Sequence, residues 1–128
     1  MFTSTDKAAD EVFIICNDEE DRRKIKAEFE SFDNVQFCLL ADRFLEITKK
    51  GTDKGAALKK ICEHLKIDTA QTIAFGDGEN DLQFLEVAGT AVAMANAVDS
   101  VKQKADIVTK SNNENGVCTV LNDLLSRI

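Results

Sequence analysis

The sequence contains no proline, no low-complexity stretch, no internal repeat and no apolar run that approaches the length of a membrane span. A transmembrane helix needs about 18 or more consecutive apolar residues, whereas the longest apolar runs here have only a few. The opening segment Met1–Asp6 has no basic region followed by an apolar stretch, so it does not resemble a secretory signal. We therefore expect a cytoplasmic protein with no membrane partner.

Histidine and closely spaced cysteines are also lacking. The one histidine, His64, cannot complete a zinc site with the cysteines at positions 16, 38, 62 and 118, none of which forms a Cys-x-x-Cys pair. No Ser-His-Asp or Cys-His arrangement indicates nucleophilic catalysis by serine or cysteine. We expect the cysteines to be small buried apolar residues of a reduced protein, without disulfides.

Basic residues are too few to balance the acidic ones. The chain has 23 aspartates and glutamates against 16 lysines and arginines, which gives a net charge of -7. This balance argues against nucleic acid or an anionic membrane as the main partner. It also repels phosphorylated substrates unless a metal or local cations offset the charge, so an anionic ligand would favour a metal-assisted site.

The 128 residues suffice for one modest domain or two small pieces, and 44% hydrophobic residues are enough for a core. The first part, residues 1–47, is predicted to form an α+β layer. Its two later strands make a hairpin that turns at Ala41–Asp42 and has one solvated face. The predicted elements are a strand at 12–16, a helix from Asp18, and strands at 35–39 and 43–47.

The second part, residues 48–128, has a different pattern. Its predicted strands are short and continuously apolar, and they alternate with amphipathic helices, which is typical of a parallel sheet covered on both faces. We therefore predict an α/β fold for this part. The strands are predicted at 72–75, 91–94 and 107–108, and the helices at 53–65, from 82, at 97–104 and at 116–125.

An acidic, glycine-rich loop, Gly76–Asp81, directly follows the predicted strand at 72–75. Ligands of open parallel sheets bind beyond the carboxyl ends of the strands, where this loop must lie. Magnesium prefers hard oxygen ligands and keeps several waters, so Asp77 with one further carboxylate, Asp81, would suffice to hold it. The alternative is an ordinary turn in which Asn80 or Asp81 caps the next helix.

Lys54 and Gly55 are locally unfavourable at the start of the predicted helix at 53–65. A cation in the first turn opposes the helix dipole by about 0.3–1 kcal/mol, and glycine costs up to about 1 kcal/mol relative to alanine. Two such residues side by side suggest a role beyond folding, and an ammonium beside a close backbone approach suits a phosphate or a carboxylate cluster. The alternative is an exposed lysine compensated by Asp53, with Thr52 as the N-cap.

Two further polar segments allow more than one interpretation. Asn96 precedes the predicted helix at 97–104, where an asparagine is most often an N-cap, although it could instead face a ligand. Residues 112–115, Asn-Asn-Glu-Asn, precede the last helix and are more typical of cap and turn chemistry than of a site.

Several segments of the second part, taken in order, resemble the haloacid dehalogenase-like hydrolases. They are Lys54-Gly55-x-x-Leu58, then IAFGDGEND at 73–81, AGTAVAMANA at 88–97, ADIVT at 105–109, and Asn113-x-x-Gly116-Val117. The match covers roughly residues 43–125. It is closest in type to the Cof-type sugar-phosphate phosphatases, which have an α+β cap. The resemblance implies that residues 48–128 are the C-terminal half of a Rossmann-like core and that residues 1–47 are the C-terminal part of the cap.

The resemblance also implies a mechanism. In that family an aspartate attacks the substrate phosphorus in line, and water then hydrolyses the aspartyl-phosphate, while Mg²⁺ bridges the nucleophile and the phosphate oxygens. The expected substrate is a small phosphorylated metabolite. Asp77 matches the family's metal ligand, and Asp81 matches a second acidic position that supports the metal's water shell or the lysine. Lys54 matches the lysine that neutralises the nucleophile and the phosphoryl group, and Asn80 is expected to hold the phosphate or the metal shell.

The family's nucleophile motif, Asp-x-Asp after the first core strand, has no counterpart in this sequence, and neither has the Ser/Thr motif of the next core strand. The acidic run at 18–21 lies in the wrong context, at the start of a cap helix. We therefore expect a fragment that is inactive alone, or alternatively a non-catalytic interaction or phosphate-binding module. In the family's sheet the nucleophile strand lies beside the strand at 72–75, so an unpaired apolar edge there predicts self-association.

Overall fold

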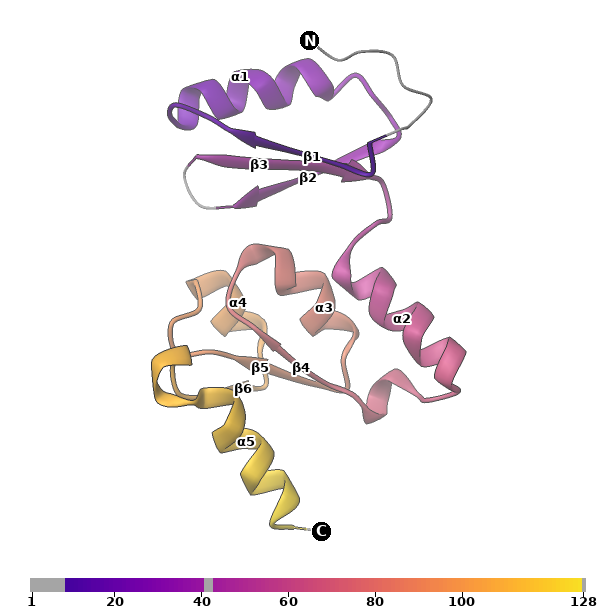
Figure 1. Ribbon diagram of the computed structural model, residues 1–128, viewed down its shortest axis with the longest axis vertical. Coiled ribbons are helices and arrows are strands. Elements are labelled where there is room, and N and C mark those ends of the chain that lie inside the picture. Colours follow the sequence, from indigo (N-terminus) through magenta and orange to yellow (C-terminus); the bar gives the residue numbers. More distant parts are fainter. Residues whose placement is uncertain (1–8, 41–42, 128) are drawn as a thin grey trace. The chain divides into compact units, whose positions relative to one another are not determined.

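The computed structural model describes residues 9–40 and 43–127, and the chain divides into two compact units after Thr52. Each unit is described by itself (Figure 1). Within the described residues, no helix is long and apolar enough to cross a membrane. The predicted turn at Ala41–Asp42 lies outside the described residues.

The first unit is a three-stranded antiparallel sheet with one helix packed against it (Figure 1). Its strands are β1 (Glu11–Ile15), β2 (Val35–Leu40) and β3 (Phe44–Lys49), in the order β1-β3-β2, and its helix is α1 (Glu19–Phe29). Asp18 caps α1, because its carboxylate accepts a hydrogen bond from the N–H of Asp21 at 2.8 Å. Cys16, Leu45 and Ile47 are buried beneath half-buried apolar residues of α1. The unit is therefore the α+β layer that the sequence predicts.

Among the described residues of this unit, no helix covers the opposite face of the sheet. Phe13 of β1 is 51% exposed, and its ring stacks on that of Phe44 in β3 with the ring centroids 5.5 Å apart. Ile15 is exposed on the same face, two residues along β1. One packed and one open face is the usual arrangement of an antiparallel sheet whose strands alternate in polarity.

The second unit is an α/β fold with a three-stranded parallel sheet, as predicted. Its strands β4 (Ile73–Gly76), β5 (Thr90–Ala93) and β6 (Ile107–Val108) lie in that order. The helices are α2 (Lys54–Leu65), α3 (Leu82–Val87), α4 (Asp99–Lys104) and α5 (Gly116–Leu125). Short 3-10 turns, η1 (Thr69–Gln71), η2 (Glu79–Asp81) and η3 (Asn112–Glu114), precede β4, α3 and α5.

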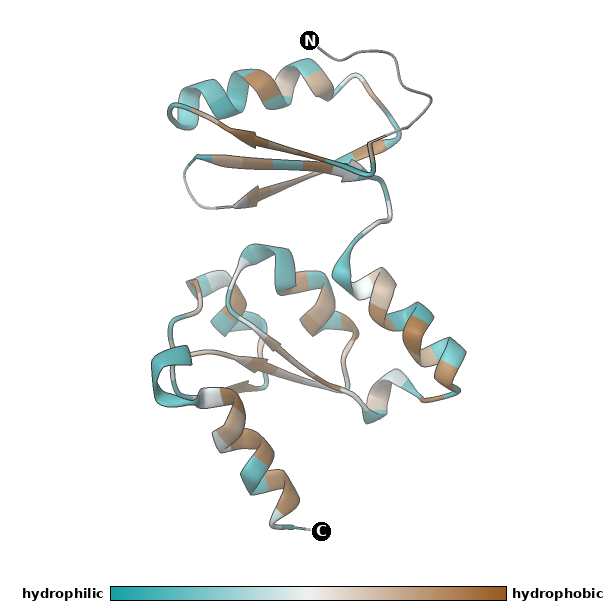
Figure 2. Ribbon diagram, in the orientation of Figure 1, coloured by the Kyte–Doolittle hydropathy of each residue, from teal (hydrophilic) through white to brown (hydrophobic). Residues whose placement is uncertain are grey.

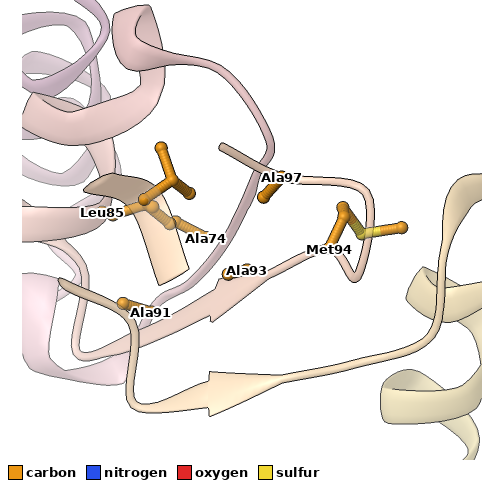
Figure 3. Packing of buried hydrophobic residues seen from close by; sticks show 7 residues of the cluster. Ala74, Leu85, Ala91, Ala93, Met94 and Ala97 are labelled. Carbon is orange, nitrogen blue, oxygen red and sulfur yellow. The ribbon is translucent and has the colours of Figure 1, made fainter. Parts of the chain in front are cut away.

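The core of the second unit combines small strand residues with larger helix residues (Figure 3). Ala74, Ala91 and Ala93 are almost fully buried on the strands, and Leu85 of α3 and Val101 of α4 pack against them. Alanine side chains allow the helices to approach the sheet closely, as the dense packing of protein interiors requires. This packing fixes the carboxyl ends of β4 and β5, from which the loops of the candidate site leave.

Two helices of this unit differ from the sequence-based expectation. α4 begins at Asp99 with Val98 as its N-cap, so the predicted start at residue 97 is wrong. α5 forms as predicted and is largely hydrophobic (Figure 2), but its apolar side is only partly covered by the described residues. The exposed fractions of Val117, Leu121, Leu124 and Leu125 range from 37% to 67%.

The cysteines follow the expectation only in part. Within the described residues none of them forms a disulfide, and Cys16 and Cys62 are buried. Cys118 is exposed, because α5 presents it to solvent, so the expectation of burial is wrong for this residue.

β4 is an edge strand of the sheet in the described part of the chain. The carbonyl groups of Thr72 and Gly76 accept hydrogen bonds from the neighbouring β5 segment at 2.9 and 3.0 Å. Because successive residues of a strand direct their peptide groups to opposite sides, those of Ile73 and Phe75 face the open edge. An open apolar edge is a template for pairing with another chain.

We predict that the chain self-associates through this β4 edge. Ile73→Lys should shift the mass measured by sedimentation at micromolar concentration toward the monomer, because a charged edge disfavours strand pairing. Ile107→Lys on β6, where the side chain is already 43% exposed, is the matched control and should leave the association unchanged. A wild-type chain that sediments as a clean monomer contradicts the prediction.

Candidate metal and phosphate site

The loop after β4 folds back on itself around one carboxylate. Asp81 Oδ2 accepts hydrogen bonds from the backbone N–H groups of Asp77 at 2.9 Å and Gly78 at 3.2 Å. Gly76 is required at the end of β4, because a Cβ there would lie 2.7 Å from the Asp81 Cβ. The glycine-rich loop is therefore a tight turn wrapped around the Asp81 side chain.

Lys54, the first residue of α2, reaches the same carboxylate. Its Nζ donates a hydrogen bond to Asp81 Oδ1 and forms an ion pair with it. Gly55 permits this contact, because a Cβ at that position would lie only 2.4 Å from the carbonyl oxygen of Gln83 in α3. The unfavourable Lys54-Gly55 pair thus has a structural reason: Gly55 lets α2 lie against α3, and Lys54 extends from there to Asp81.

Asp53 caps α2, since its Oδ1 accepts a hydrogen bond from the N–H of Ala56 at 2.8 Å. The interpretation of Thr52 as the N-cap is therefore wrong. The Asp53 carboxylate also compensates for Lys54 in the first turn, because negative charge is favourable at a helix N-terminus. The ion-pair partner of Lys54 in the structure is nevertheless Asp81.

Asp81 is buried and charged at the same time. Its side chain is only 9% exposed, and this burial is the largest single influence on its pKa and raises it. The hydrogen bond from Lys54, the backbone N–H groups of Asp77 and Gly78, and the charge of Lys54 together outweigh burial, so the pKa lies below the ordinary value of 3.8. The Lys54 side chain remains 51% exposed, so its ammonium can meet a ligand while it stays paired.

Asn96 ties the loop after β5 to Asp77. Its Nδ2 donates to Asp77 Oδ2 at 3.1 Å, and its Oδ1 accepts from the N–H of Asn112 at 2.9 Å. The backbone N–H of Val98 also donates to the carbonyl of Asp77 at 3.0 Å. The interpretation of Asn96 as an N-cap is therefore wrong, and it faces the candidate site instead. Asn112 joins the site through its backbone, which no sequence signal indicates.

The residues present fit a partial magnesium site. No group of three or more His, Cys, Asp and Glu side chains that could hold a metal occurs in the described part of the chain. Asp77 is exposed, and no donor among residues 9–40 and 43–127 contacts its other oxygen, Oδ1. Both oxygens of Asp81 are already engaged. Because Mg²⁺ needs only one or two protein carboxylates, Asp77 can be a direct ligand, with Asp81 acting through the loop.

Asn80 is the remaining predicted site residue. It is half-buried in η2, and within the described residues its side chain makes no hydrogen bond. Its amide is therefore available to a ligand at the same end of β4. The structure thus brings Lys54, Asp77 and Asp81 into direct contact and leaves Asn80 beside them.

The acidic loop and its lysine lie at the carboxyl end of a strand in a parallel α/β sheet, where such folds bind ligands. Fold and site together define a Rossmann-like core with a carboxylate–lysine site. The family profile of the haloacid dehalogenase-like hydrolases matches residues 2–121. The chain belongs to this family, which confirms the resemblance seen in the sequence.

The alignments with individual relatives include most of this chain, but this chain spans less than half of each relative's length. The Bacillus subtilis protein YkrA is 40% identical over 114 residues, which are 89% of this chain and 42% of YkrA. The 5-amino-6-(5-phospho-D-ribitylamino)uracil phosphatase YwtE of the same organism is 46% identical over 82 residues, 64% of this chain and 29% of YwtE. The solved structure of BT4131, a sugar phosphatase of subclass IIB, has a TM-score of 0.78 at 28% identity and covers 89% of this chain and 42% of that one.

The lowered pKa of Asp81 makes a prediction for stability. The pKa of Asp81 in the folded state lies below its value of about 3.8 in the unfolded state, so the charged carboxylate stabilises the folded state above that pH. This stabilisation is lost as the pH falls through the pKa of the folded state. Asp81→Asn should therefore lower the free energy of unfolding by about 1–3 kcal/mol at neutral pH, because buried donors lose an ionic acceptor. Urea unfolding measures this difference.

The difference between wild type and Asp81→Asn should shrink when unfolding is repeated at a pH of about 3. Asp123→Asn is the matched control, because Asp123 pairs with Arg127 on the exposed surface of α5 and should change stability little. A difference for Asp81→Asn that is equally large at neutral and acidic pH contradicts the charged, stabilising role of this carboxylate.

Proposed function

We propose that this chain is the metal- and lysine-bearing part of a magnesium-dependent phosphatase that hydrolyses phosphoric monoesters of small metabolites through an aspartyl-phosphate. The observation that carries the proposal is the contact of Lys54 and of the Asp77 backbone with one buried carboxylate, that of Asp81. A cation and an available carboxylate are thereby held side by side at the carboxyl end of β4. Phosphoryl transfer depends mainly on such positioning and charge neutralisation.

Each site residue would have a separate role. Lys54 would hold its ammonium against the non-bridging oxygens of the phosphoryl group. Asp77 would hold Mg²⁺ through Oδ1, and Asp81 would position Lys54 and the loop and contact the metal through its water shell. Asn80 would donate its side-chain amide to a phosphate oxygen. When bound, Mg²⁺ would supply the positive charge that offsets the phosphate and the charge developing in the transition state.

The charges of the site support the need for a metal. The protein as a whole carries a net charge of -7, which repels phosphate at long range. At short range, the charge of Lys54 is balanced by Asp81, and Asp77 adds a further negative charge. Without a divalent cation these residues would therefore repel a phosphate, which is why we propose that binding and reaction depend on Mg²⁺.

The nucleophile of the proposed reaction is not part of this sequence, since no two aspartates are separated by a single residue. We therefore propose that the chain alone is inactive and that residues outside these 128 supply the nucleophile. YwtE is named as the phosphatase of a phosphoribitylamino-uracil and BT4131 as a sugar phosphatase. Both names support a small phosphorylated metabolite as the substrate class.

A second candidate function is a non-catalytic interaction or phosphate-binding module. The missing Asp-x-Asp motif together with the half-exposed ammonium of Lys54 favours it. In that case Mg²⁺ would not raise the melting temperature, and Asp77→Ala would be tolerated or even stabilising, because it removes a repelling carboxylate. The phosphatase proposal requires the opposite result: Mg²⁺ should raise the melting temperature of this chain, and Asp77→Ala should abolish that increase.

A segment exchange tests the proposed reaction. The 128-residue chain alone should not hydrolyse p-nitrophenyl phosphate, whereas a hybrid of YwtE that carries the matching segment of this chain should do so in the presence of Mg²⁺. In the hybrid, Lys54→Ala or Asp77→Ala should lower kcat/KM by about 100-fold or more, because each removes charge stabilisation. Lys59→Ala, an exposed change on the same helix, is the matched control and should leave kcat/KM unchanged.

Three outcomes would count against parts of the proposal. A hybrid that melts cooperatively but has no activity contradicts the proposed function. Activity of the hybrid that survives Asp77→Ala contradicts the role of Asp77 as the metal ligand. Robust hydrolysis by the 128-residue chain itself contradicts the statements that the chain is inactive alone and that residues outside it supply the nucleophile.

A further inference from the structure

The side-chain amide of Asn96 lies between two partners that determine its orientation. The backbone N–H of Asn112 donates to its Oδ1 at 2.9 Å, and its Nδ2 donates to Asp77 Oδ2 at 3.1 Å. A backbone N–H can only donate, so the amide oxygen must face Asn112 and the amide nitrogen must face Asp77. The amide cannot turn over without losing both hydrogen bonds.

This arrangement completes the restraint of Asp77. The backbone of Asp77 is held on both sides, because its N–H donates to Asp81 Oδ2 at 2.9 Å and its carbonyl accepts from Val98 at 3.0 Å. The side chain is exposed, and an exposed aspartate without a partner would sample several rotamers. The hydrogen bond from Asn96 selects the rotamer in which Oδ2 is occupied and Oδ1 is left for a ligand.

We propose that Asn96 is a positioning residue that orients the Asp77 carboxylate for the divalent cation and couples the loop after β6 to the metal site through Asn112. The inference rests on the proposed function, in which Asp77 is the metal ligand. Hydrogen bonds to a metal-ligating group fix its orientation, and their loss typically lowers metal affinity by about 10–100-fold. Asn96 itself would not touch the metal.

Two variants separate the parts of the inference. Asn96→Ala removes both hydrogen bonds of the amide. Asn112→Pro removes the N–H that fixes the amide oxygen and leaves the bond from Asn96 to Asp77 in place. It also removes the Asn112 Oδ1 that accepts from the N–H of Asn113 at 3.0 Å. Asn112 is the first residue of η3, where proline is well tolerated. Ser111, which precedes it, has φ -68° and ψ 166°, the extended conformation that the residue before a proline prefers. The backbone of the turn can therefore stay as it is.

Mn²⁺ is a suitable probe for the 128-residue chain, because its paramagnetism broadens nearby amide signals in NMR spectra even when binding is weak. The signals of Gly76 and Gly78 report on the site. Asn96→Ala should raise the Mn²⁺ concentration for half-maximal broadening by about tenfold, and Asn112→Pro should raise it by a smaller factor. Asn113→Ala is the matched control and should titrate like wild type, because its side chain has no hydrogen bond among the described residues.

The outcomes distinguish the inference from the proposed function. If Asn96→Ala needs the same Mn²⁺ concentration for half-maximal broadening as wild type, the inference is overturned and the proposed function still stands. This holds even if the variant has a lower melting temperature. If Asn96→Ala binds Mn²⁺ more weakly but Asn112→Pro needs the same Mn²⁺ concentration as wild type, the proposed coupling to the loop after β6 is overturned. Broadening that is absent in wild type, or equal in Asp77→Ala, contradicts the proposed metal site and the inference together.

Discussion

The second unit depends on one buried carboxylate, that of Asp81. Its Oδ2 closes the turn at Asp77 and Gly78, and its Oδ1 receives the ammonium of Lys54, so a loop and a helix start that are distant in sequence meet at one side chain. A buried carboxylate is costly unless donors satisfy its oxygens. Here the donors come from the residues that would handle the ligand, so folding this corner and assembling the candidate site are a single event.

The small residues around Asp81 follow from the same constraint. Gly76 leaves room for the Asp81 side chain, and Gly55 lets α2 lie close enough to α3 for Lys54 to reach it. Local helix propensity opposes both Lys54 and Gly55 at the start of α2. A sequence that departs from local rules in adjacent positions indicates that a tertiary requirement prevails there, and the carboxylate of Asp81 is that requirement.

The fold class was predictable because continuous apolar strands alternate with amphipathic helices, and β4 and β5 lie one residue from their predicted places. Lys54 was also predictable as a candidate, since it and Gly55 violate local helix preferences, and the acidic loop was predictable from its place at the carboxyl end of a strand. Asn96 and Asn112 were not, because a polar residue before a helix looks the same whether it caps the helix or faces a ligand. Their contact arises from how the loops after β5 and β6 lie side by side, which is a non-local property. In the same way, the pattern of α5 predicts an apolar face but not what covers it.

The central claim is that Lys54 and Asp77 belong to one site for phosphate and metal, organised by Asp81. Because the charge of Lys54 is balanced by Asp81 while Asp77 adds a negative charge, phosphate should bind well only when a divalent cation is present. The most direct measurement is the dissociation constant of inorganic phosphate for this chain, determined by ³¹P NMR titration with and without Mg²⁺. We predict that Mg²⁺ tightens phosphate binding by about fivefold or more and that phosphate tightens Mg²⁺ binding by the same factor. A phosphate affinity that is the same with and without Mg²⁺ would contradict the claim.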